Sequence, residues 1–361
     1  PPPPPPPPPP LFFPRRSRHP RSSLVSWLGD VYKRQTTTTT TKIDLFPNVV
    51  GQYPAKRKFE FYIKGFERTG IVPNILLTAP KGAGKTMLAR AFARNLVIED
   101  VEEIDDVLHD VIVPKRYFEF NCATIKNLRQ FVEQIMVPYM QGGSKATFLF
   151  DECHMLPKKV MMALLTIINP NKNNLNTFSY EGSDIDIDFR KLTFLFATTE
   201  PQEVFHALID RMERIDLDDY SYDELGQILL LNTDRIKFSG DIVSRYIAPA
   251  LRGNGRAAQK MATNIKSYVA ANNTKTFKLS DWKDLCHILD IMPHGLNKIE
   301  LRYLRTLHRE GTVRLYNLAA KLQMTRSAIQ SDAEIYSVSY THLRAHETRE
   351  DRVCRRVLEK K

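Results

Sequence analysis

Short apolar runs and helix-type patterns alternate along the first part of the chain. Three runs have the length of a buried strand: Ile75–Leu77, Ala146–Phe150 and Leu192–Ala197. Before the first run, apolar residues recur at helical spacing, at Phe59, Tyr62, Ile63 and Phe66. Buried strands that alternate with helices predict an α/β domain with a parallel sheet, which we place over residues 43–219.

Two segments inside this domain carry other patterns. Asn176–Tyr180 and Asp184–Phe189 alternate apolar and polar residues around Glu181-Gly182-Ser183, which predicts a β-hairpin at about 176–189. If this hairpin is exposed, its apolar face needs an outside surface to cover it. The acidic stretch Glu99–Asp110 is expected to be a solvated helix–loop insertion.

After Tyr220 the pattern is helical. Apolar residues fall at helical spacing in three segments, marked by Leu225, Ile228, Leu229 and Leu230, by Ile242, Tyr246 and Ile247, and by Gly255–Tyr268. These segments predict a small all-helical domain over residues 220–293.

A further helical group follows over residues 294–337. Ile299–Gln323 predicts two short helices joined by a tight turn, and Thr325 is a suitable N-cap for a third. Three helices of this size have helix-turn-helix or winged-helix proportions.

The stretch Asn74–Leu88 has the features of a phosphate-binding loop. An apolar strand leads into a small-residue loop, and a helix-forming segment follows Lys85-Thr86. Glycine lets backbone N–H groups turn toward phosphates, Lys85 would reach the β- and γ-phosphates, and the Thr86 hydroxyl would ligate Mg²⁺. The pattern G-x-x-x-x-G-K-[ST] is met except at its first position, where Ala79 replaces Gly. The expected nucleotide-binding residues are Pro80, Lys81, Gly82, Ala83, Gly84, Lys85, Thr86 and Met87.

Adjacent carboxylates end the second apolar strand. Asp151 would hold the Mg²⁺ shell, and Glu152 would orient or deprotonate an attacking water. The third strand ends at Thr198-Thr199, where a hydroxyl could contact the γ-phosphate or that water. We expect Thr199 to take this role, with Thr198 as the alternative. Cys153 and His154, beside the acid pair, are expected to be packing residues.

Composition narrows the class of protein. No run is apolar enough to cross a membrane, and four cysteines without C-x-x-C spacing are typical of reduced thiols in a cytoplasmic protein without a zinc site.

Residues 1–35 carry six basic residues and one acidic residue, and residues 338–361 carry seven basic and four acidic residues, so the two ends hold most of the net charge of +11. Because the body is only weakly basic, any contact with DNA would have to come from a local patch, for which the candidates are Arg314, Lys321 and Arg326.

The two ends also differ from the body in pattern. Ten prolines open the chain, and the strings Leu28–Gln35 and Ser339–Arg349 resemble translated sequencing-adapter tails. We therefore expect residues 1–42 to be a disordered, non-native segment and residues 338–361 to be a non-native tail. The alternative is a genuine Pro-rich linker and a basic tail.

The order of the motifs resembles that of AAA+ ATPases, and over residues of about 43–337 the chain is similar to the RuvB family of Holliday-junction branch-migration motors. PKGAGKT resembles the family's Walker A motif, FLFDECHML its Walker B, FATTEP sensor 1, LIDRMERI the arginine-finger segment and LRGNGRAAQKM the sensor-2 helix. LFPNVVGQ is similar to the box on the adenine side. GLNKIELRYLRTL and LYNLAAKL are similar to the family's winged helix, which is apparently truncated here.

The resemblance implies an AAA+ P-loop NTPase domain, a helical lid and a C-terminal winged helix, using ATP and Mg²⁺ to drive branch migration in recombination and repair. It implies that Val49, Val50 and Gly51 lie near the base, that Arg256 is the sensor-2 residue, and that Arg211 is a finger acting on a neighbouring subunit. Arg214 is the rival finger. A hexameric ring on four-way DNA junctions and a RuvA-like partner at the 176–189 hairpin are also implied.

Three departures and two alternatives accompany this interpretation. Ala79, Glu200 (where the family usually has Arg) and the acidic insertion are atypical. A clamp-loader ATPase would share the ATTEPQ segment, although Asp210-Arg211-Met212 replaces its Ser-Arg-Cys and it would bring a zinc-binding cysteine cluster. The other alternative is a nucleotide-gated DNA-binding or loading factor that does not translocate.

Overall fold

The computed structural model describes residues 44–104, 107–141, 145–169, 171–292, 295–311 and 313–334. The terminal segments expected to be non-native, 1–42 and 338–361, lie outside these residues. The chain divides after Asp44, and every element described below belongs to the unit that begins at Leu45. None of the helices described is long and apolar enough to span a membrane.

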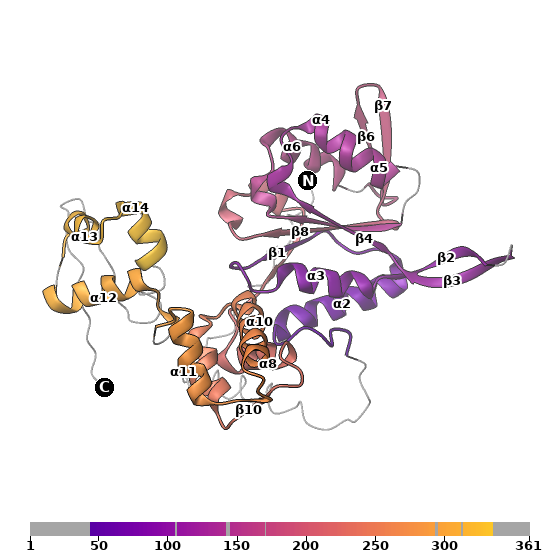
Figure 1. Ribbon diagram of the computed structural model, residues 1–361. Coiled ribbons are helices and arrows are strands. Elements are labelled where there is room, and N and C mark those ends of the chain that lie inside the picture. Colours follow the sequence, from indigo (N-terminus) through magenta and orange to yellow (C-terminus); the bar gives the residue numbers. More distant parts are fainter. Residues whose placement is uncertain are drawn as a thin grey trace, which may run out of the picture. The chain divides into compact units, whose positions relative to one another are not determined.

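The first structural feature is a five-stranded parallel sheet (Figure 1). Its strands occur in the order β4 (Arg116–Asn121), β5 (Ala146–Asp151), β8 (Leu192–Thr198), β1 (Ile75–Thr78) and β9 (Glu213–Asp216). The three apolar runs of the sequence are the three central strands, and nearly all of their residues are buried. Burial on both faces is typical of parallel sheets covered by helices, so the predicted α/β architecture is confirmed.

Helices cover both faces of the sheet (Figure 1). On one face lie α2 (Tyr53–Thr69) and α3 (Lys85–Arg94), which pack against alternate strand residues such as Ile75 and Leu77. The other face receives Leu76 and is covered by α4 (Leu128–Phe131), the π-helical η2 (Val132–Met136), α5 (Val137–Met140) and α6 (Lys158–Ile167). Short turns complete this domain: η1 (Cys122–Thr124), η4 (Cys153–Met155), η5 (Pro201–Glu203) and α7 (His206–Ile209).

Two rows of phenylalanine rings run across neighbouring strands on this second face. The strand register aligns Phe118 with Phe148 and Phe194, and Phe120 with Phe150 and Phe196. Neighbouring rings in each row stack, with centroids 5.3 to 5.8 Å apart. Cross-strand aromatic pairs stabilise a sheet, and here they fix the strands that end at the acid pair and at Thr198.

The expected helix–loop insertion at Glu99–Asp110 is wrong. Those residues form an antiparallel hairpin of β2 (Val97–Ile104) and β3 (Val107–Pro114), which extends away from the sheet in Figure 1. The two strands contain many Val and Ile residues, whose branched side chains favour extended backbone. The high content of acidic residues obscured this β-type composition.

The hairpin predicted at about 176–189 is confirmed, but its apolar side is not exposed and so does not need the outside surface considered above. The strands β6 (Leu175–Tyr180) and β7 (Ser183–Asp188) pair antiparallel across the predicted turn. Phe178, Ile185 and Ile187 are buried in the same core as the helices of the second sheet face. The hairpin therefore covers its apolar side within its own domain, and no outside surface is needed for that purpose.

Residues 220–292 form a helical group with its own hydrophobic core, which includes Leu225, Ile265 and Trp282. Tyr246 and Leu230, which fit the apolar spacing in the sequence, are nevertheless exposed. The elements of this group are α8 (Tyr222–Leu231), β10 (Lys237–Phe238), the π-helical η6 (Val243–Ile247), α9 (Ala248–Ala250), α10 (Gly255–Ala271), β11 (Thr276–Phe277) and α11 (Leu279–Ile288).

The last described residues form a fourth core around Tyr303, Leu318 and Ile329. Its elements are α12 (Lys298–Glu310), α13 (Leu315–Leu322), α14 (Arg326–Ala328) and the π-helical η8 (Ile329–Glu334). The predicted N-cap is confirmed, because the backbone N–H of Ala328 donates to Thr325 Oγ1 at 3.2 Å. Up to Glu334, the described residues of this group include no strand.

A buried lysine lies at the amino end of β4. Lys115 is 3% exposed; its Nζ donates to Arg190 O at 2.9 Å and to Thr193 Oγ1 at 3.1 Å, and lies 4.7 Å from the centre of the Phe66 ring. Burial lowers the pKa of Lys115 to about 8, although the Asp188 carboxylate acts in the opposite direction.

This burial predicts a pH-dependent contribution to stability. The pKa of an unfolded lysine is about 10.4, so between pH 8 and 10.4 the unfolded chain holds a proton that the folded chain has lost. The free energy of unfolding should therefore rise with pH across this window by about 2 kcal/mol, relative to Lys115→Met. Denaturant unfolding at pH 7.5 and pH 10 measures this difference, with the exposed Lys159→Met as a matched control. An equal effect of pH on wild type and Lys115→Met would contradict the lowered pKa.

Candidate active site

The phosphate-loop sequence joins β1 to α3 and ends at a buried lysine. Gly82 and Gly84 have φ of +84° and +93°, in the left-handed region that favours glycine. Lys85 is 7% exposed, and its Nζ donates to Ala79 O at 2.8 Å and Pro80 O at 3.2 Å. Burial lowers the pKa of Lys85, while the nearby Glu152 and Asp151 carboxylates raise it. The Lys85 ammonium, which lies between these carboxylates and the loop, can neutralise the negative charge of a bound phosphate.

The atypical Ala79 fits this loop without strain. It is buried in the core beneath α3, and its N–H donates to Thr198 O at 3.3 Å. Its φ is not positive, so the backbone there does not require glycine. The departure from the usual pattern therefore leaves the loop geometry intact.

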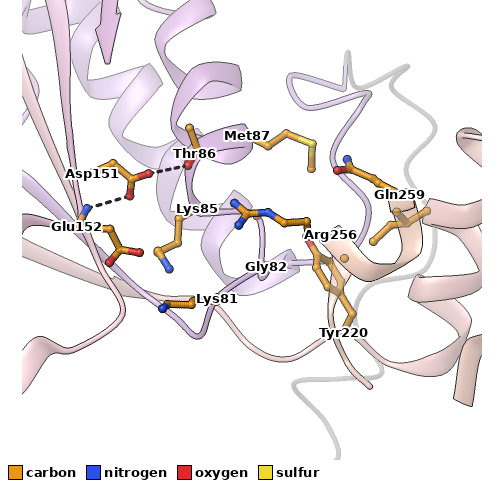
Figure 2. A pocket seen from close by; sticks show the side chains of 13 residues that line it. Lys81, Gly82, Lys85, Thr86, Met87, Asp151, Glu152, Tyr220, Arg256 and Gln259 are labelled. Carbon is orange, nitrogen blue, oxygen red and sulfur yellow. Dashed lines mark hydrogen bonds between the residues drawn. The ribbon is translucent and has the colours of Figure 1, made fainter. Parts of the chain in front are cut away.

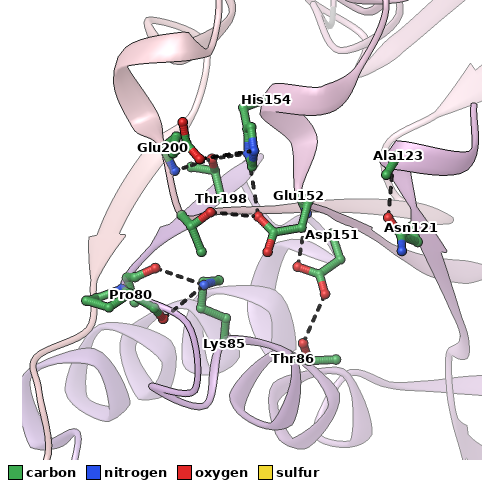
Figure 3. Close-up of polar contacts among 12 residues, drawn as sticks. Pro80, Lys85, Thr86, Asn121, Ala123, Asp151, Glu152, His154, Thr198 and Glu200 are labelled. Atoms are coloured by element: carbon green, nitrogen blue, oxygen red, sulfur yellow. Dashed lines mark hydrogen bonds and ion pairs between the residues drawn. The ribbon is translucent and has the colours of Figure 1, made fainter. Parts of the chain in front are cut away.

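The acid pair stands directly opposite Thr86 (Figure 3). The Thr86 hydroxyl donates to Asp151 Oδ2 at 3.3 Å, and the Glu152 N–H donates to Oδ1 at 3.0 Å. Burial raises the pKa of Asp151, and the hydrogen bond from the Glu152 backbone opposes this rise. A hydroxyl and a carboxylate at one end of a phosphate loop are oxygen ligands of the kind that Mg²⁺ binds.

Glu152 lies at the end of β5 with a φ of +52°, which is unusual for a residue other than glycine. The Thr199 hydroxyl donates to its Oε2 at 3.0 Å. Thr198 is buried and is engaged elsewhere, because its Oγ1 lies 2.9 Å from His154 Nδ1 and accepts the Glu200 N–H at 3.0 Å. Of the two threonines, Thr199 is the one whose hydroxyl contacts the acid.

His154 does more than pack. Its Nδ1 lies 3.5 Å from Glu152 Oε2 as well as 2.9 Å from Thr198 Oγ1, and its Nε2 lies 3.9 Å from Glu200 Oε1 (Figure 3). His154 thus connects the acid of β5 to the end of β8. Cys153 is fully buried, as expected for a packing residue, and His154 is nearly buried but also makes these polar contacts.

The phosphate loop and the acid pair line a pocket of about 410 Å³ (Figure 2). Thr199, which was expected at the site, contacts Glu152 but is not among the residues that line this pocket. Arg256 and Gly255 reach it from the start of α10, where Asn254 Oδ1 caps the helix by accepting the N–H groups of Arg256 and Ala257. The residues expected from the sequence that line the pocket are Lys81, Gly82, Gly84, Lys85, Thr86, Met87, Asp151, Glu152 and Arg256.

Four lining residues were not anticipated: Tyr220, Ile228, Gly255 and Gln259. Gln259 lies three residues after Arg256 on α10, so helical spacing could have identified it. Tyr220 approaches the loop so closely that a Cβ on Gly84 would lie 2.6 Å from its hydroxyl oxygen. Nothing in the local sequence around Tyr220 or Ile228 indicates this contact.

Other expected nucleotide-binding residues do not line the pocket. Val49 and Ala83 are buried in the core under α2 and α3, while Val50 belongs to the core that contains Tyr220 and Ile228. A Cβ on Gly51 would meet the Glu224 side chain at 2.0 Å. Pro80 contributes its carbonyl to Lys85. None of Val49, Val50, Gly51, Pro80 and Ala83 is among the residues that line the pocket.

The two candidate finger residues lie outside this pocket. Arg211 is exposed after α7, where its Nη1 donates to Ala207 O. Arg214 is on β9 and its Nε lies 2.7 Å from Asp216 Oδ1. The guanidinium of Arg214 is thus held by an ion pair within its own subunit.

The three candidate DNA-binding residues are all exposed on the last helical group. Arg314 precedes α13 and Arg326 begins α14. Lys321 forms an ion pair with Glu310, which also binds Arg309. Arg314 and Arg326 are therefore better placed than Lys321 to meet a phosphate.

Comparisons with known proteins agree with this geometry. Residues 75–218 match the model of the ATPase family associated with various cellular activities (AAA). The chain is 24% identical over 308 residues to the Holliday junction branch migration complex subunit RuvB of Wolinella succinogenes, covering 81% of this chain and 83% of that protein. It is 25% identical over 287 residues to the RuvB subunit of a Wolbachia from Brugia malayi, covering 77% and 80%.

Solved structures share the fold. The Thermotoga maritima RuvB Holliday junction branch migration motor matches with a TM-score of 0.63 at 21% identity, covering 86% of this chain and 95% of that one. A single-residue mutant of the same protein matches with a TM-score of 0.64, covering 85% and 94%. With its phosphate loop, acid pair and Arg256 gathered at one pocket, the chain carries an AAA-type ATPase domain over residues 75–218 and is similar to RuvB subunits over most of its length.

Proposed function

We propose that the chain is the ATP-hydrolysing motor subunit of a ring that drives branch migration of four-way DNA junctions. The observation that carries this proposal is the pocket, which brings Lys85 and Glu152 together with Arg256 from the helical group. Such a pocket can link hydrolysis to movement of the helices beside it. The matched relatives, which are named as branch migration subunits, support DNA as the substrate of that movement.

Within the pocket each side chain has a distinct proposed role. Lys85 binds the β- and γ-phosphates, Thr199 positions the attacking water, and Glu152 accepts its proton. Thr86 and Asp151 are the ligands that would hold Mg²⁺, which when bound neutralises charge on the phosphates. The fit is supported by the oxygen atoms of Thr86 and Asp151 at 3.3 Å and by the glycines that leave the loop backbone open to an anion.

We propose a ring because Arg211 does not line the pocket of its own subunit. Arg211 is exposed outside the site, so it can act as a finger only in the pocket of a neighbouring subunit. The ion pair of Arg214 with Asp216 makes it the weaker candidate. Six subunits in the ring are proposed by resemblance.

A division into an ATPase domain (43–219), a lid (220–293) and a DNA-binding winged helix (294–337) is proposed on the basis of the separate hydrophobic cores. Arg314 and Arg326 would contact DNA phosphates, and Lys321 would contribute once released from Glu310. A RuvA-like partner at β6–β7 would have to use the polar side of the hairpin, because the apolar side is buried. A cytoplasmic location is part of the same proposal.

Junction-stimulated ATPase activity tests the proposed function. We expect four-way junctions to raise the rate of ATP hydrolysis about tenfold at low salt. The stimulation should fall with added salt, since phosphate contacts release counterions. Arg326→Ala should lower the slope of log affinity against log salt by about one, while Lys64→Ala on α2 should not change it. Both variants keep the basic terminal segments, so non-specific binding by these segments cancels in the comparison.

Two results would redirect this proposal. Stimulation by a sliding clamp on primed template, and not by junctions, would favour a clamp loader. DNA binding without any stimulated turnover would favour a loading factor that does not translocate.

A further inference from the structure

The loop between α9 and α10 has an unusual backbone. Arg252 and the next residue, Gly253, both have positive φ, of +56° and +68°. For arginine this conformation costs energy and persists only when surrounding contacts hold it. The contacts that hold Arg252 come from the last helical group.

Arg252 forms a forked ion pair with Glu300 near the start of α12. Its Nη1 donates to Glu300 Oε1 at 2.8 Å, and its Nη2 donates to Glu300 Oε2 and to Gly295 O. Glu300 is 1% exposed, and its Oε2 also accepts the Asn297 N–H at 2.7 Å in a capping box. A buried carboxylate held by both guanidinium nitrogens gives a contact with one defined geometry.

The backbone at this contact is equally close. A Cβ on Gly295 would lie 2.3 Å from Ala250 O, so the turn before α12 packs directly on the end of α9. Any shift of the loop after Ala250 must therefore either carry α12 with it or break the fork.

The C-terminal end of the loop between α9 and α10 also contacts the phosphate loop. Asn254 Nδ2 donates to Lys81 O at 3.2 Å, and the Gly255 N–H donates to Gly82 O at 3.1 Å. Gly82 lies so near that a Cβ there would be 2.0 Å from Asn254 Oδ1. Arg256, which follows Gly255, lines the pocket together with Gly82 (Figure 2). Within the five-residue segment 252–256, Arg252 contacts α12, Asn254 and Gly255 contact the phosphate loop, and Arg256 lines the pocket.

We infer that the Arg252–Glu300 pair is the element through which the nucleotide in the pocket controls the helices α12–α14. A change of nucleotide alters how Arg256, Asn254 and Gly255 sit on Gly82. The fork passes that displacement to α12, in addition to the covalent connection through residues 289–297. The inference extends the proposed function, because those helices are the ones proposed to bind DNA.

The test uses Glu300→Gln in the full-length chain, which keeps the side-chain size and removes the charge. Arg252 is 27% exposed and can be solvated once unpaired. The double variant Arg252→Gln/Glu300→Gln leaves no unpaired charge and guards against misfolding of the single variant. The matched control is Asp290→Asn, which removes an exposed ion pair of 2.8 Å to Lys298 near the start of the same helix.

Two measurements report the coupling. The first is the ratio of DNA dissociation constants with a non-hydrolysable ATP analogue and with ADP. The second is hydrogen exchange of the α12 amides with the same two nucleotides, which does not involve DNA. We expect wild type and Asp290→Asn to show a ratio of about tenfold and nucleotide-dependent exchange. Both Glu300 variants should bring the ratio to within about twofold of one and lose the nucleotide dependence of exchange, while basal ATP turnover stays within about twofold.

Retention of the nucleotide-dependent exchange in both Glu300 variants would overturn the inference. So would its absence in wild type. If wild type binds no DNA but the exchange behaves as expected, the proposed function fails and the coupling stands, so the two failures are distinguishable.

Discussion

Glu152→Gln should leave ATP binding intact and lower the turnover number by at least about 100-fold. The carboxylate of Glu152 accepts the Thr199 hydroxyl and faces the pocket that also holds Lys85. A glutamine of the same size cannot take a proton from water, so the base is lost while the phosphate-binding groups remain.

Steady-state phosphate release gives the turnover number, and calorimetric titration with ATP gives the affinity. Glu203→Gln, an exposed change on η5 outside the pocket, is the matched control and should behave like wild type. Weak binding combined with normal turnover in Glu152→Gln would remove this residue from the catalytic site.

Arg211→Ala should bind ATP normally and hydrolyse it about 1,000-fold more slowly, because a finger neutralises charge that develops only in the transition state. The stronger result is recovery in mixtures. Lys85→Ala subunits have a defective pocket but an intact finger, so an excess of them should restore part of the turnover of Arg211→Ala subunits. Phosphate release across a series of mixing ratios measures this recovery.

Two controls make the mixing experiment decisive. Glu152→Gln mixed with Lys85→Ala should recover nothing, since neither subunit has a working pocket. Arg214→Ala should retain most turnover, because that arginine pairs with Asp216 in its own chain. Mixtures of Arg211→Ala that never exceed the single variants would count against a finger acting between subunits.

The sequence predicted the central features of the site because their chemistry is local. A phosphate loop needs glycines, a lysine and a threonine at fixed spacing, and Asp151 and Glu152 are adjacent in the chain. The parallel sheet then brings the strand ends Thr78, Asp151 and Thr198 to one edge. The three strand ends lie together because the sheet is parallel, as predicted, whereas the order of its strands was not predicted from the sequence.

Contacts made by distant parts of the chain were not readable. Tyr220 and Ile228 reach the pocket through the packing of the helical group. The role of His154 depends on Thr198 and Glu200 lying opposite it, which no local pattern indicates. The Arg252–Glu300 pair joins residues 48 positions apart and had no signal in either segment.

Errors in secondary structure came from giving composition too much weight. The acidic residues of Glu99–Asp110 suggested a solvated helix, yet the Val and Ile residues between them favour the strands that form. The 176–189 hairpin was predicted correctly, but the alternation of apolar and polar residues does not indicate which surface covers its apolar side. The structure shows that Phe178 and Ile185 are buried in the core of their own domain.

At position 152 the residue that best fits the left-handed backbone differs from the residue that catalysis requires. Glycine or asparagine would adopt a φ of +52° at lower cost, so a chain selected only for folding would carry one of them at this position. Natural selection for turnover must retain an acid whose backbone is strained there. Drift to asparagine or glycine at position 152 would thus produce subunits that fold at least as well and hold nucleotide without consuming it. In a ring, such subunits would assemble in the folded state with nucleotide bound but would not hydrolyse it.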